Sequence, residues 1–394
     1  MRTAPVVGIS SRIKDTTMKA LLSIKRKLPP ALVVGLLLAA VVGWPLQAAT
    51  TESNLHKTFA VQPGGRLVME VDRGPIDITT SDRGDVQVEV TRKVTKGSAA
   101  KAAEIFAAHE VTFDQDGDRV EVHAKVKKDA QSWFNRGNQN LQVEYHVLAP
   151  RRFNLELRTA GGEIVSTDVE GSVKASTAGG SLRFRNITGP FDGQTAAGEI
   201  RLESASGRVT AKTSGGSIEL GEVGSDTLAT TAAGSINIRT AKAGLTAKTS
   251  GGSIELGQAV GPAELRTAAG SIRVKSAQAK LDANTSGGGI TIDDARDTVI
   301  AHTAAGSITA SFSQQPHDAC QLTTAGGGID LRLAEKLAFD VEARTSGGDV
   351  TTELPLVSTV VGRQQAGVLQ GKLNGGGTSL VLKTSAGNIS IRKR

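Results

Sequence analysis

Three acidic residues, Asp293, Asp294 and Asp297, form the densest carboxylate cluster in the repetitive part of the sequence. Carboxylate pairs carry out glycoside cleavage, and carboxylates also hold hard cations. No basic or aromatic platform for a sugar accompanies these residues. We therefore interpret the cluster as a solvated turn, with a cation site or a polysaccharide-cleaving site as the alternative.

A second acidic stretch, Asp114 to Asp118, is similar to the start of a calcium loop. Its glycine is in the wrong position for an EF-hand, and the bidentate Glu at the twelfth position is missing. We expect a hairpin turn there, between a strand at 111–113 and another at 119–122.

Histidine and cysteine are not spaced as metal ligands. The six histidines are His56, His109, His123, His146, His302 and His317, and the single cysteine is Cys320. The sequence predicts no metal site, no cofactor and no catalytic residue. Cys320 falls in a column of residues expected to point inward, so we expect a buried, unpaired thiol rather than a nucleophile.

Aromatic side chains among amides occur in one stretch, residues 131–140. Trp133, Phe134, Arg136 and Asn138 are candidate ligand contacts there, because Trp, Phe and Arg are enriched at binding hot spots. The alternative is that Trp133 and Phe134 close the end of the core.

An internal sequence repeat determines where these residues lie in the fold. A Thr followed three residues later by Gly and five residues later by Ile, Leu or Val recurs in steps of 18 residues. The anchors are Thr159, Thr177, Thr195, Thr213, Thr231, Thr249, Thr267, Thr285 and Thr303, and Thr324, Thr345 and Thr384 follow at longer steps. Their glycines include Gly198, Gly216, Gly234, Gly252 and Gly270. The segment 210–221 recurs unchanged at 246–257, which adds a period of 36 residues.

Each unit alternates as two short strands joined at the glycine. One unit cannot bury its apolar stripe alone, so the units must stack. The sequence therefore predicts an all-β fold, a single-stranded β-solenoid of 18-residue coils. We expect the corner glycine to supply a positive φ. Residues four before the anchor should point inward, and residues six after it outward: Arg183, Arg201, Glu219, Asn237, Glu255 and Arg273, as a ladder of charges or a ligand-binding stripe.

The chain is predicted to have three parts. Residues 1–49 read as a signal peptide with a possible true start at Met18, residues 50–157 as a strand-rich N-terminal capping segment, and residues 158–394 as regular solenoid repeats. In the capping segment we expect strands at 66–71, 76–79, 86–94, 120–126 and 141–148, and one helix from Ala99 to about His109, capped by Ser98. A solenoid has an open edge at each end, which this segment and the basic residues 392–394 should protect.

The charge of the chain comes mainly from its leader. Seven basic residues and one acidic residue lie in 1–49, out of a net charge of +7. The remainder is nearly neutral, so the sequence predicts no nucleic-acid partner.

Several stretches of the sequence carry a family resemblance: VQPGGRL at 61–67, GPIDI at 74–78, LELRTAGGEI at 155–164, the recurrent TSGGSI, and LVLKTSAGNISI at 380–391. They resemble a bacterial putative-adhesin domain family of unknown function, a β-strand-repeat domain compared with autotransporter adhesin heads. The resemblance implies a β-solenoid in the cell envelope, suggests adhesion, and brings no catalytic residues.

Together these patterns predict an exported, non-enzymatic protein, periplasmic or on the cell surface and not integral to the membrane after signal cleavage. Its expected partner is an envelope component, a glycan or a surface protein. A carbohydrate-active β-helix enzyme and a self-associating envelope scaffold are the alternatives.

Overall fold

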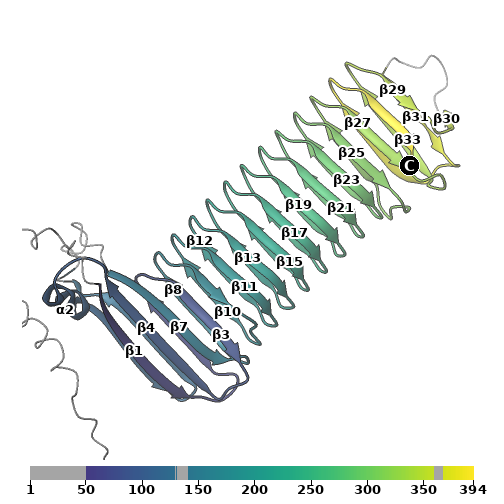
Figure 1. Cartoon of the computed structure of the whole chain (residues 1–394). Helices are drawn as coiled ribbons and strands as arrows, with labels where there is room; N and C mark the ends of the chain where they lie inside the picture. The colour runs from purple at the N-terminus through teal and green to yellow at the C-terminus, as the bar shows by residue number, and fades with distance from the viewer. Residues whose placement is uncertain (1–49, 129, 131–140, 359–366) are drawn as a thin grey trace, which may run out of the picture. The chain divides into compact units, whose positions relative to one another are not determined.

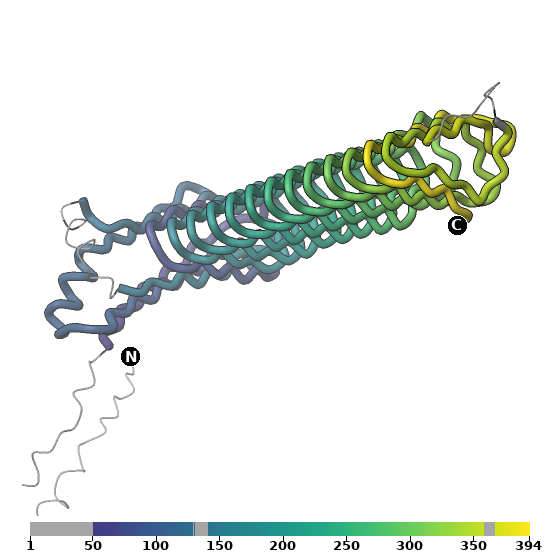
Figure 2. The backbone as a smooth tube through the Cα atoms, turned by 90° about the horizontal axis from the view of Figure 1, so that it is seen from above, coloured from purple at the N-terminus to yellow at the C-terminus, as the bar shows by residue number. Residues whose placement is uncertain are grey.

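Strict alternation within each 18-residue unit produces the coils. In β15 (Ile218–Val223), Ile218 and Leu220 are buried while Glu219 between them points outward. The computed structural model describes residues 50–128, 130, 141–358 and 367–394, which belong to one compact unit. Figure 1 shows its strands stacked coil upon coil, and Figure 2 shows the same coils as successive turns of one tube. The predicted β-solenoid is confirmed.

The strands form two sheets. Sheet A contains β1 (Thr51–Ala60), β4 (Asp85–Val94), β7 (Leu141–Pro150), β3 (Ile76–Ser81), β9 (Ile164–Ser166), β11 (Leu182–Ile187), β13 (Ile200–Ala205), β15, β17 (Ile236–Ala241), β19 (Ile254–Ala259), β21 (Ile272–Ala277), β23 (Ile290–Ala295), β25 (Ile308–Phe312), β27 (Ile329–Leu333), β33 (Ile389–Lys393) and β29 (Val350–Thr352), in this spatial order.

Sheet B faces sheet A across the core. Its strands are β5 (His109–Asp116), β6 (Arg119–Val126), β2 (Arg66–Val71), β8 (Asn154–Thr159), β10 (Val173–Thr177), β12 (Phe191–Thr195), β14 (Val209–Lys212), β16 (Thr227–Thr230), β18 (Leu245–Lys248), β20 (Ala263–Arg266), β22 (Leu281–Asn284), β24 (Val299–Thr303), β26 (Cys320–Thr324), β32 (Thr378–Thr384), β28 (Phe339–Thr345), β31 (Val368–Leu373) and β30 (Leu356–Ser358). The pairing from β6 to β28 is parallel throughout.

The anchor threonines form a continuous hydrogen-bonded ladder inside the stack. The Oγ1 of Thr213 donates to the carbonyl of Gly198 in the preceding coil at 3.0 Å, and accepts from the N–H of Gly216 in its own coil at 3.2 Å. The same hydroxyl-to-carbonyl contact occurs at all twelve anchors. Every one of these side chains is buried, so the ladder satisfies polar groups that water does not reach.

The reason we predicted for the anchor glycines is wrong. None of them is among the glycines with positive φ in the described residues. Glycine is required by close approach instead: a Cβ built on Gly216 would lie 1.9 Å from the carbonyl oxygen of Gly198. Successive corners stack so tightly that no side chain fits between them.

The last coil does not lie at the end of the stack. β32 pairs with β26 on one side and with β28 on the other, and β33 lies likewise between β27 and β29. The coil at 378–393 is therefore inserted before the coil at 339–352. We had expected the basic C-terminus to protect the stack's end, but the antiparallel strands β31 and β30 close sheet B there.

The first coil is inserted in the same way. β2 pairs with both β6 and β8, and β3 with both β7 and β9, so residues 66–81 lie between two coils that come later in the chain. The predicted boundary at residue 157 thus falls inside β8. All five strands predicted in the capping segment are present, and β1 and most of β5 are strands that the sequence analysis missed.

The predicted helix is α2 (Ala99–Ala108), with the Oγ of Ser98 accepting from the N–H of Lys101 at 3.3 Å. Arg92 fixes its C-terminal end. The guanidinium of Arg92 donates to the carbonyls of Phe106 and His109, each at 3.1 Å, and to the Oγ of Ser53 at 2.8 Å. A cation at this end of a helix is favourable because the free carbonyls carry partial negative charge.

Candidate binding face

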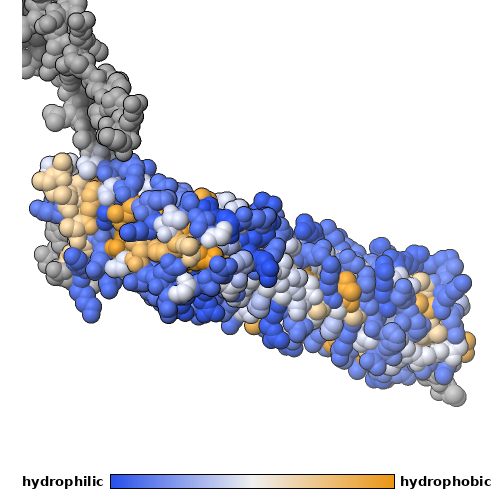
Figure 3. All heavy atoms as spheres, turned by 90° about the horizontal axis from the view of Figure 1, so that it is seen from below, coloured by the Kyte–Doolittle hydropathy of each residue, from blue (hydrophilic) through white to orange (hydrophobic). Residues whose placement is uncertain are grey.

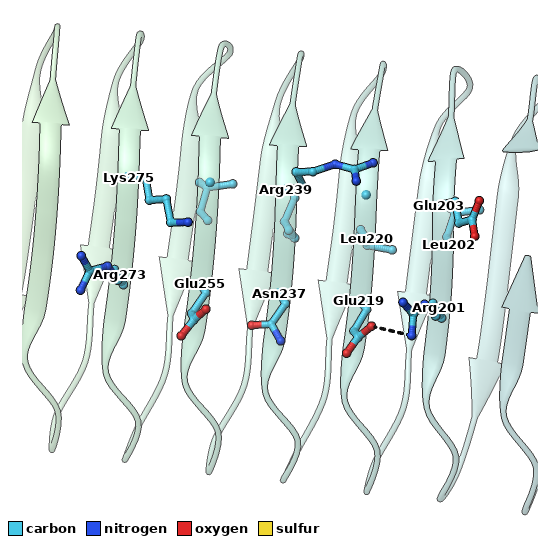
Figure 4. Close-up of a pocket in the computed structure, with 14 residues that line it drawn as sticks. Arg201, Leu202, Glu203, Glu219, Leu220, Asn237, Arg239, Glu255, Arg273 and Lys275 are labelled. Atoms are coloured by element: carbon cyan, nitrogen blue, oxygen red, sulfur yellow. Dashed lines mark ion pairs between the residues drawn. The ribbon is translucent and has the colours of Figure 1, made fainter. Parts of the chain in front are cut away.

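Two outward columns of side chains line a groove on sheet A. Figure 4 shows them on five successive strands, β13 to β21. One column, six residues after each anchor, holds Arg201, Glu219, Asn237, Glu255 and Arg273. The other, eight residues after the anchor, holds Glu203, Gly221, Arg239, Gly257 and Lys275.

Two glycines hollow out the surface. Gly221 and Gly257 occupy outward positions in alternate coils. The coils between and beside them carry the long side chains of Glu203, Arg239 and Lys275 at the same position. The groove has a volume of about 560 Å³ and is open along its length. The guanidinium of Arg239 occupies the space above Gly221. A Cβ built on Gly221 would lie only 2.8 Å from an Nη atom of this guanidinium.

Two cations of the groove form no ion pair among the described residues, although the charge of one of them, Arg239, contributes to lowering the pKa of Glu222. Among the described residues, Arg201 pairs with Glu219 at 3.4 Å, and Arg273 turns to Asp293 at 2.9 Å. Glu203 lies 3.9 Å from Arg185. No ion pair of Arg239, Lys275 or Glu255 occurs within the part of the chain that the structure describes. The exposed groups free to meet a ligand are thus two cations and one carboxylate.

The sequence predicts one of the two columns. The column from Arg183 to Arg273 does point outward, as the alternation indicated, but only Arg201 and Glu219 form an ion pair along it. Arg183 pairs with Glu163 instead. The column of Arg239 and Lys275 was missed. The sequence does contain a signal for this second column. Gly221 and Gly257 are the last residues of the exactly repeated twelve-residue segment, and strand alternation places both of them on the outward face.

A similar groove, of about 600 Å³, lies on the outer face of sheet B over strands β14 to β22. Its lining alternates in charge, with Arg208 3.8 Å from Asp226. Gly244 and Pro262 widen it, and Glu264 is paired with both Lys248 and Arg266, at 3.1 and 2.6 Å. The carboxylates of this groove all have basic partners, and Lys280 is its one lining cation without an ion pair among the described residues, whereas the groove on sheet A has two such cations.

The acidic cluster is held by protein groups. Asp293 pairs with Arg273, Asp294 with Arg296 and Arg394 at 2.8 Å each, and Asp297 lies 3.0 Å from the Nδ1 of His317. Burial raises the pKa of Asp294, but hydrogen bonds from Ser313 and Arg296 and the charge of Arg394 outweigh it, so the pKa is lowered. A carboxylate ionised in this way accepts bonds and is poorly suited to act as a general acid.

The other predicted polar residues have structural surroundings. The expected hairpin between β5 and β6 is present, but Asp114 and Asp116 belong to β5, and the turn itself consists of Gly117 and Asp118. The Oδ1 of Asp118 accepts from the N–H of Gln62 at 2.7 Å. Cys320 is free and buried, as predicted, and burial raises the pKa of its thiol to about 11. No group of residues suited to a metal ion occurs among those described. Trp133, Phe134, Arg136 and Asn138 lie outside the described residues.

Comparison with known families identifies the central coils. The family model described as Toastrack DUF4097 matches residues 208–322, which include most of the groove on sheet A. These coils are thus similar to a Toastrack DUF4097 domain. The family resemblance predicted from the sequence is thereby confirmed. No curated protein matches the chain.

Solved structures similar to this chain have low sequence identity. They include a putative cell adhesion protein from Clostridium sporogenes, with 9% identity, 87% of this chain and 100% of that chain covered, and a TM-score of 0.17. A putative adhesin from Bacteroides fragilis has 10% identity, coverages of 87% and 97%, and a TM-score of 0.22. A putative lipid binding protein from Parabacteroides distasonis has 13% identity, the same coverages, and a TM-score of 0.23. At these values no function is transferred to this chain.

The surface of the described chain is mainly polar. Figure 3 shows a largely hydrophilic face, on which hydrophobic side chains gather toward the N-terminal end and are scattered over the rest. Large exposed hydrophobic residues among those described are limited to Leu148, Val260 and Val357. No helix in the described residues is long and apolar enough to cross a membrane.

Proposed function

We propose that the protein is an exported, non-enzymatic, adhesin-like interaction module that binds its partner in the groove on sheet A. The observation that carries this proposal is the pair of exposed, unpaired cations, Arg239 and Lys275, set beside the side-chain-free positions Gly221 and Gly257. The strands beneath them are hydrogen-bonded on both sides, so the positions from which these side chains project are fixed before a ligand arrives. Preorganisation of this kind lowers the entropic cost of binding.

The expected ligand is an extended anionic polymer, such as an acidic glycan of the cell envelope. Arg239 and Lys275 are two coils apart, a separation of about 9.6 Å at the usual strand spacing. A long, open groove fits a polymer better than a small molecule, which would need an enclosed pocket. Two of the three carboxylates that line the groove, Glu203 and Glu219, already have arginine partners, so negative ligand groups meet mainly free cations.

Binding of polygalacturonate, with neutral dextran as the control polymer, tests this function. We expect binding of the acidic polymer that weakens as salt rises. Arg239→Ser combined with Lys275→Ser should weaken it about tenfold or more, since hydrogen bonds to charged groups contribute about 1.5 kcal/mol or more each. The matched control is Lys212→Ser with Lys248→Ser, which removes the same charge from sheet B. If the two double variants weaken binding equally, or if neither polymer binds, the groove on sheet A is not the binding site for an acidic polymer.

Export is proposed from the order of residues in the leader, a basic stretch followed by an apolar run and small residues. Labelling of intact cells with a membrane-impermeant amine reagent separates the two predicted locations, since Lys212 and Lys248 are exposed. Labelling while a periplasmic marker stays unlabelled would place the protein on the surface. Labelling only after the outer envelope is opened would place it in the periplasm, and labelling only after lysis of the whole cell would contradict export.

A further inference from the structure

Strand β1 presents a long open edge at one end of sheet A. It pairs with β4 along ten consecutive residues, from Thr51 opposite Val94 to Ala60 opposite Asp85, without a bulge. On its other side it pairs with no strand among the described residues. It contains no proline, and an open edge of this length is a template for pairing with another chain.

The other edges of the two sheets are protected. The far edges of sheets A and B are β29 and β30, each three residues long, and Pro355 lies between them. The second edge at the N-terminal end is β5, whose exposed side chains include Glu110, Asp114 and Asp116. Two copies of β5 placed side by side would bring carboxylates against carboxylates, which is destabilising.

We propose that two copies of this chain pair through β1, antiparallel, to form one continuous sheet across the dimer. Side chains directly opposite each other in an antiparallel pair lie on the same face, so residues of the same parity must face each other. Of the registers that satisfy this condition, the one centred on Asn54 places Glu52 of each copy opposite His56 of the other. No like charges then face each other.

The side chains needed for this register are accessible. Glu52, Asn54 and His56 are exposed on the outer face of β1. The carboxylate of Glu52, about half exposed, accepts from the side-chain amide of Asn54 at 3.1 Å and lies 4.0 Å from the Nζ of Lys93, and both contacts are open to solvent. Registers centred on Leu55 or His56 lack the acid–base pair, because Glu52 then faces Thr58 or Ala60. The sequence of β1 is thus complementary to itself in one register.

Such pairing closes after two copies. An antiparallel contact between identical strands has twofold symmetry and uses up the edge on both partners. The short strands and the proline at the far edges prevent further addition there, so the expected product is a dimer and not a fibre. The dimer would present two copies of the sheet A groove, although its formation does not depend on the function proposed for that groove.

Sedimentation and disulfide trapping of the full chain test the proposal. We expect a mass of two chains for the wild type, falling to one chain on dilution. Asn54→Lys places two lysines together on the twofold axis and should weaken dimerisation about tenfold or more. Thr58→Lys is the matched control, because its opposite residue lies at the end of the paired segment. Asn54→Cys should form an intermolecular disulfide under mild oxidation and Thr58→Cys should not, and buried Cys320 leaves a low background.

Each outcome decides the question. A dimer that Asn54→Lys weakens and Asn54→Cys traps would establish the β1 interface. A monomer at all concentrations would overturn it, as would a dimer that is insensitive to both substitutions, since that dimer would use another surface. A far-ultraviolet circular dichroism spectrum shows that each variant is folded, which is expected because position 54 is exposed.

Discussion

The guanidinium of Arg394 lies 2.8 Å from a carboxylate oxygen of Asp294, a residue one hundred positions earlier in the chain. The contact exists because β33 is inserted beside β27 and does not extend the stack. The side chain of Asp294 is only 15% exposed, so the C-terminal residue is bound close to the body of the solenoid. The order of coils in space therefore differs from their order in the chain at this end.

Removal of the inserted coil should release the coil beyond it. A chain ending at Gly377 lacks β32 and β33, so β28 and β29 lose their parallel neighbours. We expect hydrogen exchange of residues 339–352 to rise to that of an unfolded segment, while the coils at 208–277 stay protected, because repeat proteins couple mainly to nearest neighbours. Arg394→Ser is the control and should cost less than about 1 kcal/mol. Unchanged protection at 339–352 would show that the insertion contributes little.

The threonine ladder can be tested at one rung. Thr231→Val keeps the side-chain shape but removes the hydroxyl that donates to the carbonyl of Gly216 at 2.9 Å and accepts from the N–H of Gly234 at 3.3 Å. Two buried backbone groups lose a partner, at about 1–3 kcal/mol for each group left unsatisfied. Thr230→Val, one residue away and facing outward, should change the free energy of unfolding by less than about 0.5 kcal/mol. Thermal melts of both variants compare the two positions directly.

Neighbouring glycines at the corner should respond differently to the same methyl group. A Cβ on Gly216 would lie 1.9 Å from a carbonyl oxygen, whereas one on Gly215 would lie 3.6 Å from its nearest neighbours, an ordinary contact. We expect Gly216→Ala to open the stack locally and lower the melting temperature by several degrees, and Gly215→Ala to be tolerated. The chain already carries alanine at the position of Gly215 in alternate coils, for example at Ala233. Equal melting temperatures would contradict the close-approach explanation.

The coils could be predicted from sequence because the side chain at each position of a coil must point either into the core or into solvent, and the residue type shows which. Alternation placed Ile218 and Leu220 inward without knowledge of their partners, and the anchor column fixed the register. The insertion of β33 could not be predicted, since the 39-residue step from Thr345 to Thr384 indicates an excursion but not where the chain returns. The purpose of Gly216 depends on the distance between two corners, which no single unit reveals. β1 was missed because polar Glu52, Asn54 and His56 give it only a weak apolar alternation.

The single thiol should be unreactive in the folded protein. Cys320 is fully buried in β26, and burial raises its pKa to about 11, so little thiolate is present at neutral pH. We expect no alkylation by iodoacetamide at pH 8 in native buffer and complete alkylation in urea, followed by mass spectrometry. Thr230→Cys supplies an outward-facing thiol in the same protein and should be modified readily. Rapid native labelling of Cys320 would mean that the coil opens near β26.

Acid should weaken the N-terminal end of the stack through Asp72. One of its carboxylate oxygens accepts from the N–H of Val126 at 2.8 Å, and the other lies 3.4 Å from the Nε2 of buried His109. Burial raises the pKa of Asp72, but the bonds from His109 and Val126 and the charges of His109 and Arg73 outweigh it, so the pKa is lowered. A lowered pKa in the folded state stabilises the protein above the unfolded value of about 3.9. This stability is lost as the pH falls through the folded value.

Asp72→Asn should therefore lower the free energy of unfolding at pH 7 by about 1.5 kcal/mol or more, the usual contribution of a hydrogen bond to a charged group. The difference from wild type should shrink as the pH falls below about 4, because the carboxyl of unfolded wild type then takes up a proton, and the folded carboxyl does so only below its lowered pKa. Asp82→Asn removes a carboxylate that is 90% exposed and serves as the control, with a small effect at both pH values. Chemical denaturation at pH 7 and pH 3 measures both differences. A gap between Asp72→Asn and wild type that stays constant with pH would mean that packing of the side chain, and not its charge, stabilises this end of the solenoid.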